Sequence, residues 1–338
     1  MRWIILVACM LLVSGCHMAW LTFSPVQYKC ASWMGGEYAA HPEKLDIYGT
    51  ISFPITFVFG FIGAYLFDRY GSYIPLMIGG WSLTPACALR VAACYVEDAD
   101  TRHVMFIVAQ AFGGISTSML SLSPTKIAAV WFAENQRTLA NTAVTLMLPG
   151  GILIAYVLSP PLVDLLAVEN EDGTKNFDLS FQVLMWFYFV WNLIGTLLIT
   201  FFMSNPGVPP SPASPTSEQP VLPFFKGVWT ALKNPMYLLI VGAMACGMGL
   251  VSVIEVELPT IMCPWGFSDI FASSYSITIL NVSGTVSSFF FAVVIDKYGT
   301  DLVSLWGNKK ITVIELIPRI LMIGTAMHSV KKRSKYSP

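Results

Sequence analysis

Two charged pairs stand where long apolar segments of the chain end, and they are near copies of each other. Asp68 and Arg69 close the stretch GAYLFDRYG, and Asp296 and Lys297 hold the same places in FAVVIDKYG, about 230 residues later. Because charge at the middle of a bilayer is costly, such pairs belong at the water interface, and the glycine that follows permits a tight turn. The repeat indicates a duplicated membrane unit of the kind from which secondary transporters are built.

Ionisable side chains also stand inside apolar segments. Arg90 and His17 lie within two of them, and Glu255 and Glu257 lie near the outer end of a third. Because intramembrane charge is costly, a functional role is the first hypothesis for each. His17 could couple to protons or ligate haem iron, since its pKa lies near neutrality. The alternatives stay open: a single histidine is more often simply hydrogen-bonded, and long charged side chains can extend to the interface.

The composition identifies the class of protein. The chain has 338 residues, of which 55% are hydrophobic and 12% are charged, and its mean hydropathy is +0.64. Soluble domains carry roughly 25% charged residues, so this is an integral membrane protein whose surroundings are the lipid bilayer. Its formal net charge of −1 provides no basic surface for nucleic acid.

Enzyme and cofactor motifs are missing from the sequence. It has no H-E-x-x-H metal site, no G-x-S-x-G nucleophile elbow, no P-loop and no dinucleotide-binding G-x-G-x-x-G after a strand. We therefore expect no catalytic residue, no metal site and no resident cofactor.

Eight segments are long and apolar enough to span a bilayer, which takes about 20 residues. The first resembles a secretory signal because Ser14, Gly15 and Cys16 follow an apolar run, but the run continues to Val26, so we interpret it as a span. The eight predicted spans are Trp3–Val26, Ile47–Phe67, Tyr73–Val96, His103–Leu122, Leu139–Leu162, Phe181–Met203, Met236–Leu258 and Ile270–Ile295.

The distribution of lysine and arginine predicts the orientation, because cytoplasmic loops carry an excess of both. With the N-terminus inside, seven basic residues face the cytoplasm and four face the outside, and both acid–base pairs are cytoplasmic. The inner residues are Arg2, Arg69, Lys126, Arg137, Lys226, Lys233 and Lys297, and the outer ones are Lys29, Lys44, Arg102 and Lys175.

A proline- and serine-rich stretch, 204–223, divides the chain. Its composition excludes a helix and favours an extended linker. We predict an N-terminal six-helix bundle over residues 1–203, a cytoplasmic linker over 204–234, a partial second bundle of two spans over 235–299, and an atypical cytoplasmic tail over 300–338.

Several motifs resemble those of one transporter family. Gly63-x-x-x-x-Asp68-Arg69-x-Gly71 resembles the cytoplasmic loop signature of the major facilitator superfamily, although that family usually continues with basic residues where this chain has Ser72 and Tyr73. The stretches RWIILV, AWLTFSPV and SPTKIAAVWFAENQRTLAN, followed by LSP at 158–160, are similar to solute carrier family 49, the feline leukaemia virus subgroup C receptor-related transporters. The resemblance covers about residues 2–300.

The resemblance implies an all-α membrane fold with twelve spans in two bundles of six. This chain has eight, so the implied fold is a complete N-terminal six-helix bundle plus an incomplete C-terminal bundle. Because a rocking-bundle transporter binds its substrate between the two halves, the missing spans bear directly on function.

The resemblance also implies site residues. Trp20 corresponds to a tryptophan that helps to enclose a quaternary ammonium substrate such as choline, and a desolvated cation over an indole gains about 2 kcal/mol. Gln110 corresponds to a substrate-contacting glutamine. The alternatives are an interfacial tryptophan and an amide that bonds to a neighbouring helix. With His17 and Arg90, these are the candidate substrate contacts.

In the superfamily, the acid–base loop pairs charges across helices and stabilises one access state. The resemblance therefore implies a gate made of Asp68, Arg69, Asp296 and Lys297, with Asp68 paired to Arg137. The alternative is an ordinary solvated helix end.

Two functional hypotheses follow. The first is a secondary-type transporter that moves a small organic solute, either an organic cation such as choline or a haem-like amphiphile, by alternating access in the plasma membrane. The second is a non-transporting truncated protein that binds or regulates a full-length homologue.

Overall fold

The computed structural model describes residues 2–169, 175–203, 224–262, 265–266, 271 and 275–287. Within these residues the chain is helical apart from one two-stranded hairpin, which confirms the predicted all-α class. The chain divides into two compact units, Met1–Phe224 and Phe225–Pro338. The division of the chain into two bundles, a linker and a tail stays a prediction.

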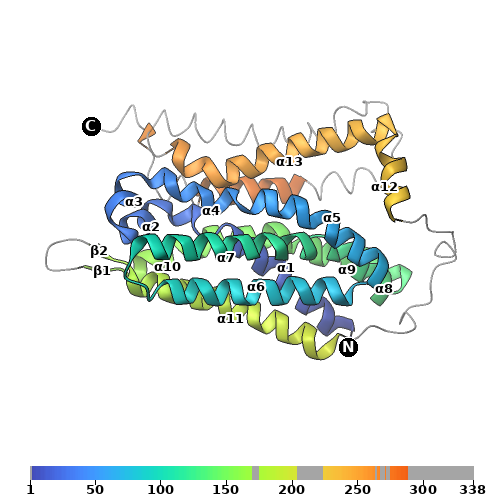
Figure 1. Cartoon of the computed structure of the whole chain (residues 1–338), viewed down its shortest axis with the longest axis horizontal. Coiled ribbons are helices and arrows are strands. Elements are labelled where there is room, and N and C mark those ends of the chain that lie inside the picture. The colour runs from blue at the N-terminus through green and yellow to red at the C-terminus, as the bar shows by residue number, and fades with distance from the viewer. Residues whose placement is uncertain are drawn as a thin grey trace. The chain divides into compact units, whose positions relative to one another are not determined.

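The first unit is a bundle of long helices that run side by side (Figure 1). Helix α1 packs on α7, α10 and α11, while α6 packs on α7 and α11, and α5 packs on α7. The long helices are α1 (Arg2–Trp20), α5 (Ser52–Tyr70), α6 (Tyr73–Ala93), α7 (Ala99–Leu120), α10 (Met147–Leu165) and α11 (Asp178–Phe202).

Short elements lie at both ends of this bundle. At one end are α2, α3 and the β1–β2 hairpin, and at the other are α8 and the N-terminus (Figure 1). The short elements are η1 (Ser24–Val26), α2 (Gln27–Met34), α3 (Gly36–Ala40), η2 (Pro42–Asp46), α4 (Ile47–Thr50), α8 (Ser123–Trp131), α9 (Glu134–Thr145), β1 (Val168–Glu169) and β2 (Lys175–Asn176). The strands are antiparallel, with Val168 opposite Asn176 and Glu169 opposite Lys175. The hairpin was not predicted.

Seven segments of the described chain are long and apolar enough to cross a membrane, and they coincide with the first seven predicted spans. They are Arg2–Trp20, Pro42–Tyr70, Tyr73–Ala93, Ala99–Trp131, Gln136–Leu165, Asp178–Phe202 and Pro235–Leu258. The eighth predicted span, 270–295, lies partly outside the described residues. Within its described part, residues 276–287 are helical.

Prolines shift two of the predicted boundaries. The first span was expected to reach Val26, but α1 ends at Trp20 and a 3₁₀ turn begins at Ser24 with Pro25 in its first turn. Pro25 has no N–H to donate to the Leu21 carbonyl, so the α-helical hydrogen bonds cannot continue through it. The fifth span was predicted as one helix, but a turn at Leu146 separates α9 from α10. Pro149 has no N–H for the carbonyl of Thr145, which accounts for the break.

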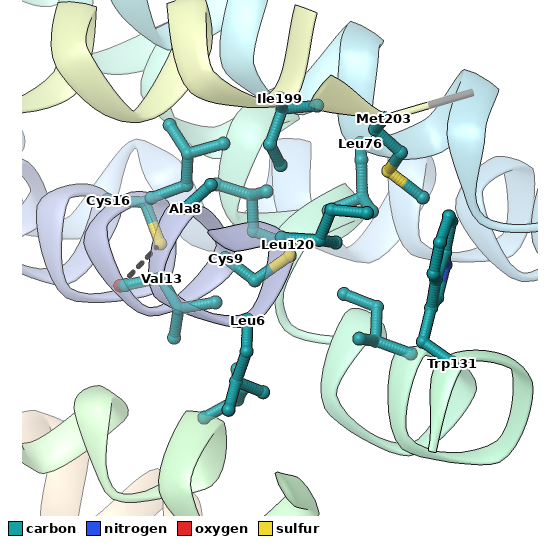
Figure 2. Packing of buried hydrophobic residues seen from close by; sticks show 14 of the residues in the cluster. Leu6, Ala8, Cys9, Val13, Cys16, Leu76, Leu120, Trp131, Ile199 and Met203 are labelled. Atoms are coloured by element: carbon teal, nitrogen blue, oxygen red, sulfur yellow. Dashed lines mark hydrogen bonds between the residues drawn. The ribbon is translucent and has the colours of Figure 1, made fainter. Parts of the chain in front are cut away.

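Helix α1 is the most deeply buried of the seven candidate spans in the described chain. Figure 2 shows its side chains among those of the helices around it, with Leu120 of α7 and Ile199 of α11 at the same contact. The Cys16 thiol bonds back to the Val13 carbonyl at 3.1 Å, which satisfies it within the helix. The labelled residues are Leu6, Ala8, Cys9, Val13, Cys16, Leu76, Leu120, Trp131, Ile199 and Met203.

Small residues allow α1 to approach its neighbours closely. A Cβ added to Gly151 of α10 would lie 2.2 Å from the Ser14 carbonyl oxygen, and one added to Gly15 would lie 2.0 Å from the Asn192 side chain of α11. Between α6 and α11, the Thr84 and Thr196 hydroxyls bond at 2.9 Å, and Thr196 also donates to the Gly80 carbonyl at 3.2 Å. Lipid tails are as apolar as the side chains, so such close packing and hydrogen bonds hold membrane helices together.

The second unit contains one long helix among its described residues. Helix α12 (Phe224–Leu232) begins at the boundary between the two units in the sequence, and α13 (Pro235–Met262) follows it. Glu255 is buried and Glu257 is half-buried within α13, which runs past the predicted span end at Leu258. Asp296, Lys297 and the tail lie outside the described residues.

The packing of α10 on α1 makes a matched pair of substitutions informative. Gly151→Ala places a methyl group against a backbone oxygen that has no freedom to rotate away, so we expect a loss of about 1–3 kcal/mol of stability. Gly150→Ala is the control, because the nearest atoms to its Cβ are the Met147 sulfur and methyl, at 3.9 Å. Thermal unfolding of the purified variants in detergent measures the difference. Equal midpoints for the two variants would contradict the contact.

Candidate functional site

A buried polar network surrounds the C-terminal end of α1. The guanidinium of Arg90, which is only 1% exposed, extends from α6. Its Nη1 donates to the Ala19 carbonyl at 2.8 Å and to the Thr22 hydroxyl at 3.1 Å, and its Nη2 donates to Gln110 Oε1 at 2.8 Å. The Gln110 amide, fully buried on α7, donates in turn to the Trp20 carbonyl at 3.3 Å. Three helices therefore meet at one cation.

The position of Arg90 follows from the electrostatics of a helix end. The last carbonyls of α1 have no partner inside the helix, and together they carry the negative end of its dipole. In the described part of the chain Arg90 forms no ion pair with a carboxylate. Its charge is instead compensated by the carbonyl of Ala19, the hydroxyl of Thr22 and the amide oxygen of Gln110, and its Nε has no partner.

The network brings three of the four predicted substrate contacts together. Arg90, Gln110 and the backbone of Trp20 bond to one another, so the polar groups of the first two are largely occupied within the protein. His17 lies one turn earlier on α1, edge-on to Trp20 with ring centroids 6.3 Å apart. Its Nδ1 bonds to the Val13 carbonyl at 2.9 Å. Contact with a substrate stays a prediction for all four.

The indole of Trp20 is half-buried and held in one orientation. Its Nε1 donates to the Gly49 carbonyl at 2.8 Å, and its ring meets Phe53 edge-on, with centroids 5.6 Å apart. The ring forms part of the wall of a small, partly enclosed cavity. The cavity is lined by Trp20, Phe23, Ser24, Gln27, Leu45, Asp46, Tyr48 and Gly49.

We call residues 27–46 the cap segment, because its short helices lie over the end of the bundle that holds Trp20. Lys29 of the segment pairs with Asp164 of α10 at 2.8 Å. The Trp33 indole donates to Asp178 of α11 at 2.6 Å, and the guanidinium of Arg102 of α7 lies 4.1 Å from the centre of a Trp33 ring. These contacts attach the cap segment to three helices.

Two further hydrogen bonds at the same end of the bundle join the short helices α3 and α4 to α7. The Tyr38 hydroxyl donates to Asp100 at 2.8 Å, and the Tyr48 hydroxyl lies 2.6 Å from His103 Nδ1. Burial, and then the neighbouring Asp100 carboxylate, raise the pKa of the Tyr38 phenol to about 12. The phenol therefore remains protonated, and a donor, at physiological pH.

The predicted gate residues that the structure describes, Asp68, Arg69 and Arg137, lie at the other end of the bundle and form no ion pair with one another. Asp68 and Arg69 are exposed at the end of α5, and Gly71 follows with φ of 74°, a backbone conformation that favours glycine, so the predicted turn is confirmed. Arg137 on α9 donates from Nε to the Phe132 carbonyl at 3.1 Å. The predicted Asp68–Arg137 ion pair is therefore not formed here. The other half of the gate, Asp296 and Lys297, lies outside the described residues.

The sequence reasoning missed Asp46, Tyr48 and Thr22. Each lies in a stretch that was assigned to a loop or to the end of a span, where polar residues carry no special signal. One signal was available: Pro25 implies that α1 ends before it, and a helix that ends early leaves carbonyls for a buried donor such as Arg90 to satisfy.

Comparison with known proteins identifies the family. A model described as Major Facilitator Superfamily matches residues 5–330. The chain belongs to the Major Facilitator Superfamily. This membership confirms the prediction made from the loop signature that includes Asp68 and Arg69, and it makes the chain a multi-pass membrane protein of a transporter superfamily.

The curated relatives include members of solute carrier family 49, as the motifs predicted. The chain is 26% identical over 300 residues to solute carrier family 49 member A3 of Danio rerio. This alignment covers 88% of the present chain and 59% of the Danio rerio protein. The chain is 25% identical over 275 residues to the protein of the same name from Xenopus tropicalis, with 80% and 54% covered. The chain thus spans little more than half the length of these relatives.

Solved structures confirm the superfamily fold. The crystal structure of a D-xylose-proton symporter aligns with a TM-score of 0.56 at 15% identity, covering 88% of this chain and 69% of that one. The inward open conformation of the xylose transporter XylE from E. coli aligns with a TM-score of 0.51 at 16% identity, covering 88% and 70%. At these identities the likeness concerns the fold alone.

The Arg90–Gln110 contact can be tested by a double-mutant cycle. Gln110→Leu leaves a buried guanidinium N–H without its acceptor, and we expect it to cost about 1–3 kcal/mol. Arg90→Leu is also destabilising, but the double variant should be less destabilised than the sum of the two, because the cation and its acceptor are removed together. Unfolding midpoints in detergent provide the coupling energy.

Ser123→Ala is the control partner for Gln110→Leu in this cycle. Ser123 lies beyond the end of α7, and the ten steps from Gln110 to Leu120 alone rise about 15 Å along the helix. Its hydroxyl bonds to the Leu120 carbonyl, so its effect should add to that of Gln110→Leu. Additivity for Arg90 and Gln110 as well would show that their contact contributes nothing.

Proposed function

We propose that this chain acts in the transport of a small organic cation across the plasma membrane by alternating access, with its N-terminus in the cytoplasm. Membership of the superfamily supports transport, and the half-exposed indole of Trp20 at a cavity that also holds a carboxylate supports a cation. Quaternary ammonium groups such as that of choline bind to aromatic faces. Because the chain spans only part of its relatives' length, transport by this chain is itself part of the proposal.

A haem-like amphiphile is the other substrate class that the resemblance implies, and the geometry supports it less well. The Nδ1 of His17 bonds to the Val13 carbonyl, an arrangement that many metal-binding histidines share, so this contact does not decide between the two substrate classes. Arg90, a natural partner for a propionate, is directed at the end of α1 and at Gln110. We therefore favour the cation.

The acid–base turns fit a gate that closes in another conformation. Asp68 and Arg69 are exposed, so they are available to partners, and Arg137 lies on helix α9. We propose that these residues, with Asp296 and Lys297, stabilise one access state on the cytoplasmic side. The signature shared with the superfamily supports this role.

A second candidate function is the regulation of a full-length homologue. The alignment with solute carrier family 49 member A3 of Danio rerio covers 88% of this chain but only 59% of that relative. In this superfamily the substrate site lies between two bundles. A chain of this length could therefore associate with a complete transporter instead of moving a solute.

Uptake into vesicles tests the first proposal. Purified chain reconstituted in liposomes should accumulate radiolabelled choline, and Trp20→Leu should lower the uptake by at least tenfold, because about 2 kcal/mol of cation–ring attraction is lost. Trp20→Phe retains an aromatic face and should retain much of the activity. Uptake by Trp20→Leu at the wild-type level would overturn the role of the indole.

Trp186→Leu is the matched control for this experiment. Trp186 lies on the outer face of α11, is 44% exposed, and donates to the Tyr95 hydroxyl at 3.3 Å. It lies away from the cavity, so its replacement should leave uptake unchanged. A loss equal to that of Trp20→Leu would indicate general damage to the fold.

Co-expression tests the second proposal. If the chain is a regulator, it should show no uptake alone, should co-purify with a complete solute carrier family 49 relative, and should change that relative's uptake. The chain carrying Gly151→Ala, which disturbs the bundle, should lose this effect. Uptake by the chain alone, with no change in the co-expressed relative, would exclude the regulatory function.

A further inference from the structure

Helix α12 has an apolar face and a basic face, and neither proposed function uses it. Its larger apolar side chains recur at positions i, i+3, i+4 and i+7, a spacing that gathers them on one side of a helix. Its polar side chains recur at i, i+4 and i+7 on the opposite side. The apolar face consists of Phe225, Val228, Trp229 and Leu232, and the basic face of Lys226, Thr230 and Lys233.

A sharp turn sets α12 across the end of the candidate span α13. Pro235 begins α13, and a proline disfavours helical geometry at the residue before it, so α12 cannot continue through Asn234. The Oδ1 of Asn234 accepts hydrogen bonds from the N–H groups of Met236 at 3.1 Å and Tyr237 at 3.4 Å, which caps the start of α13. Figure 1 shows α12 at a steep angle to α13. A helix that crosses the end of a span in this way lies along the membrane surface.

The apolar face of α12 suits the boundary between headgroups and acyl chains. Trp229 and Leu232 are 62% and 48% exposed, and none of the residues of α12, all of which the structure describes, is buried. A helix that lies on a membrane inserts such a face among the acyl chains. Trp229 borders the basic face, where Lys233 Nζ lies 5.2 Å from the centre of its ring. Indoles favour this level of a membrane.

The lysines of α12 have no acidic neighbours. The sequence from 219 to 254 contains no aspartate or glutamate. In the part of the chain that the structure describes, neither Lys226 nor Lys233 forms an ion pair, whereas Lys29 and Lys44 of the cap segment are both paired with carboxylates. Both lysines are exposed, so their charges are available to an anion outside the chain. The cytoplasmic leaflet is anionic, and each lysine near it strengthens binding by about a factor of five.

We propose that α12 binds the acidic phospholipids of the cytoplasmic leaflet, with Lys226 and Lys233 at the anionic headgroups and Trp229 and Leu232 among the acyl chains. The choice of leaflet rests on the proposed orientation, with the N-terminus in the cytoplasm. The lipid contact itself goes beyond the proposed function, because it requires no substrate. Through the Asn234 turn, the contact holds the start of α13 at the membrane surface.

Hydrogen exchange of the purified full chain in lipid nanodiscs tests this contact. Replacing part of the phosphatidylcholine with phosphatidylserine should slow exchange of the backbone amides of residues 225–233 by at least fivefold. Lipid that binds the helical state stabilises it by mass action, and the charge of each lysine contributes about a factor of five. Soluble O-phosphoserine carries a phosphate and a carboxylate but no acyl chains. It should not slow exchange in phosphatidylcholine nanodiscs.

Lys226→Gln combined with Lys233→Gln keeps the apolar face but removes both charges, so the slowing by phosphatidylserine should be lost. Lys126→Gln combined with Lys175→Gln is the matched control, because it removes the same charge from two exposed lysines of the first unit. This control should keep the slowing. Trp229→Gln weakens insertion into the acyl chains and should speed exchange in both kinds of nanodisc.

Several outcomes would overturn the lipid contact. They are exchange that ignores phosphatidylserine in the wild type, slowing retained without Lys226 and Lys233, slowing lost equally in the control, and equal slowing by O-phosphoserine, which would indicate a site for a soluble anion. Slow exchange in every lipid and in detergent would also overturn it, because protein would then cover the helix.

The proposed function and the lipid contact fail separately. Slowing that depends on phosphatidylserine, in a chain that takes up no choline, would support the contact and exclude transport by this chain. Choline uptake with exchange that ignores phosphatidylserine would do the reverse. An N-terminal tag that is accessible on intact cells would place α12 at the outer leaflet and overturn the choice of leaflet.

Discussion

A buried positive charge without a carboxylate beside it determines how the first unit is arranged. Removing a guanidinium from water is costly unless its N–H groups find acceptors. Arg90 finds them in the carbonyl of Ala19, the hydroxyl of Thr22 and the amide of Gln110. This requires α1 to end where it does, α6 to present Arg90 at that depth, and α7 to place Gln110 opposite. One side chain thereby fixes the relative positions of three helices.

The remaining contacts of α1 follow from that arrangement. Once the end of α1 is fixed, its flank must approach α10 and α11 closely, and Gly151 and Gly15 provide the space. The Trp191 indole of α11 donates to the Leu11 carbonyl at 3.1 Å and adds a polar contact on the same side. In a bilayer such contacts replace the hydrophobic driving force that packs soluble helices. The apolar cluster around Leu12 is therefore a consequence of close approach as much as its cause.

The spans could be predicted because length and hydropathy suffice for them, whereas their ends and partners depend on tertiary structure. Arg90 and Gln110 were each identified as unusual polar residues in apolar segments, but nothing in the sequence indicated that they bond to each other. The pairing of Lys29 with Asp164 joins residues far apart in the chain, and no local pattern predicts it. The expected Asp68–Arg137 pair rested on the superfamily signature, and the Arg137 guanidinium instead bonds to the nearby Phe132 carbonyl.

The attachment of the cap segment has a consequence for how the protein changes shape. Lys29, Trp33 and Tyr38 join the segment to α10, α11 and α7 of the same bundle. In a mechanism where one bundle rocks against another, the segment travels with its own bundle as a rigid body and does not unfold or refold. An antibody that recognises the folded segment would thus bind equally well throughout the cycle. It would serve to orient particles for imaging without trapping any one state.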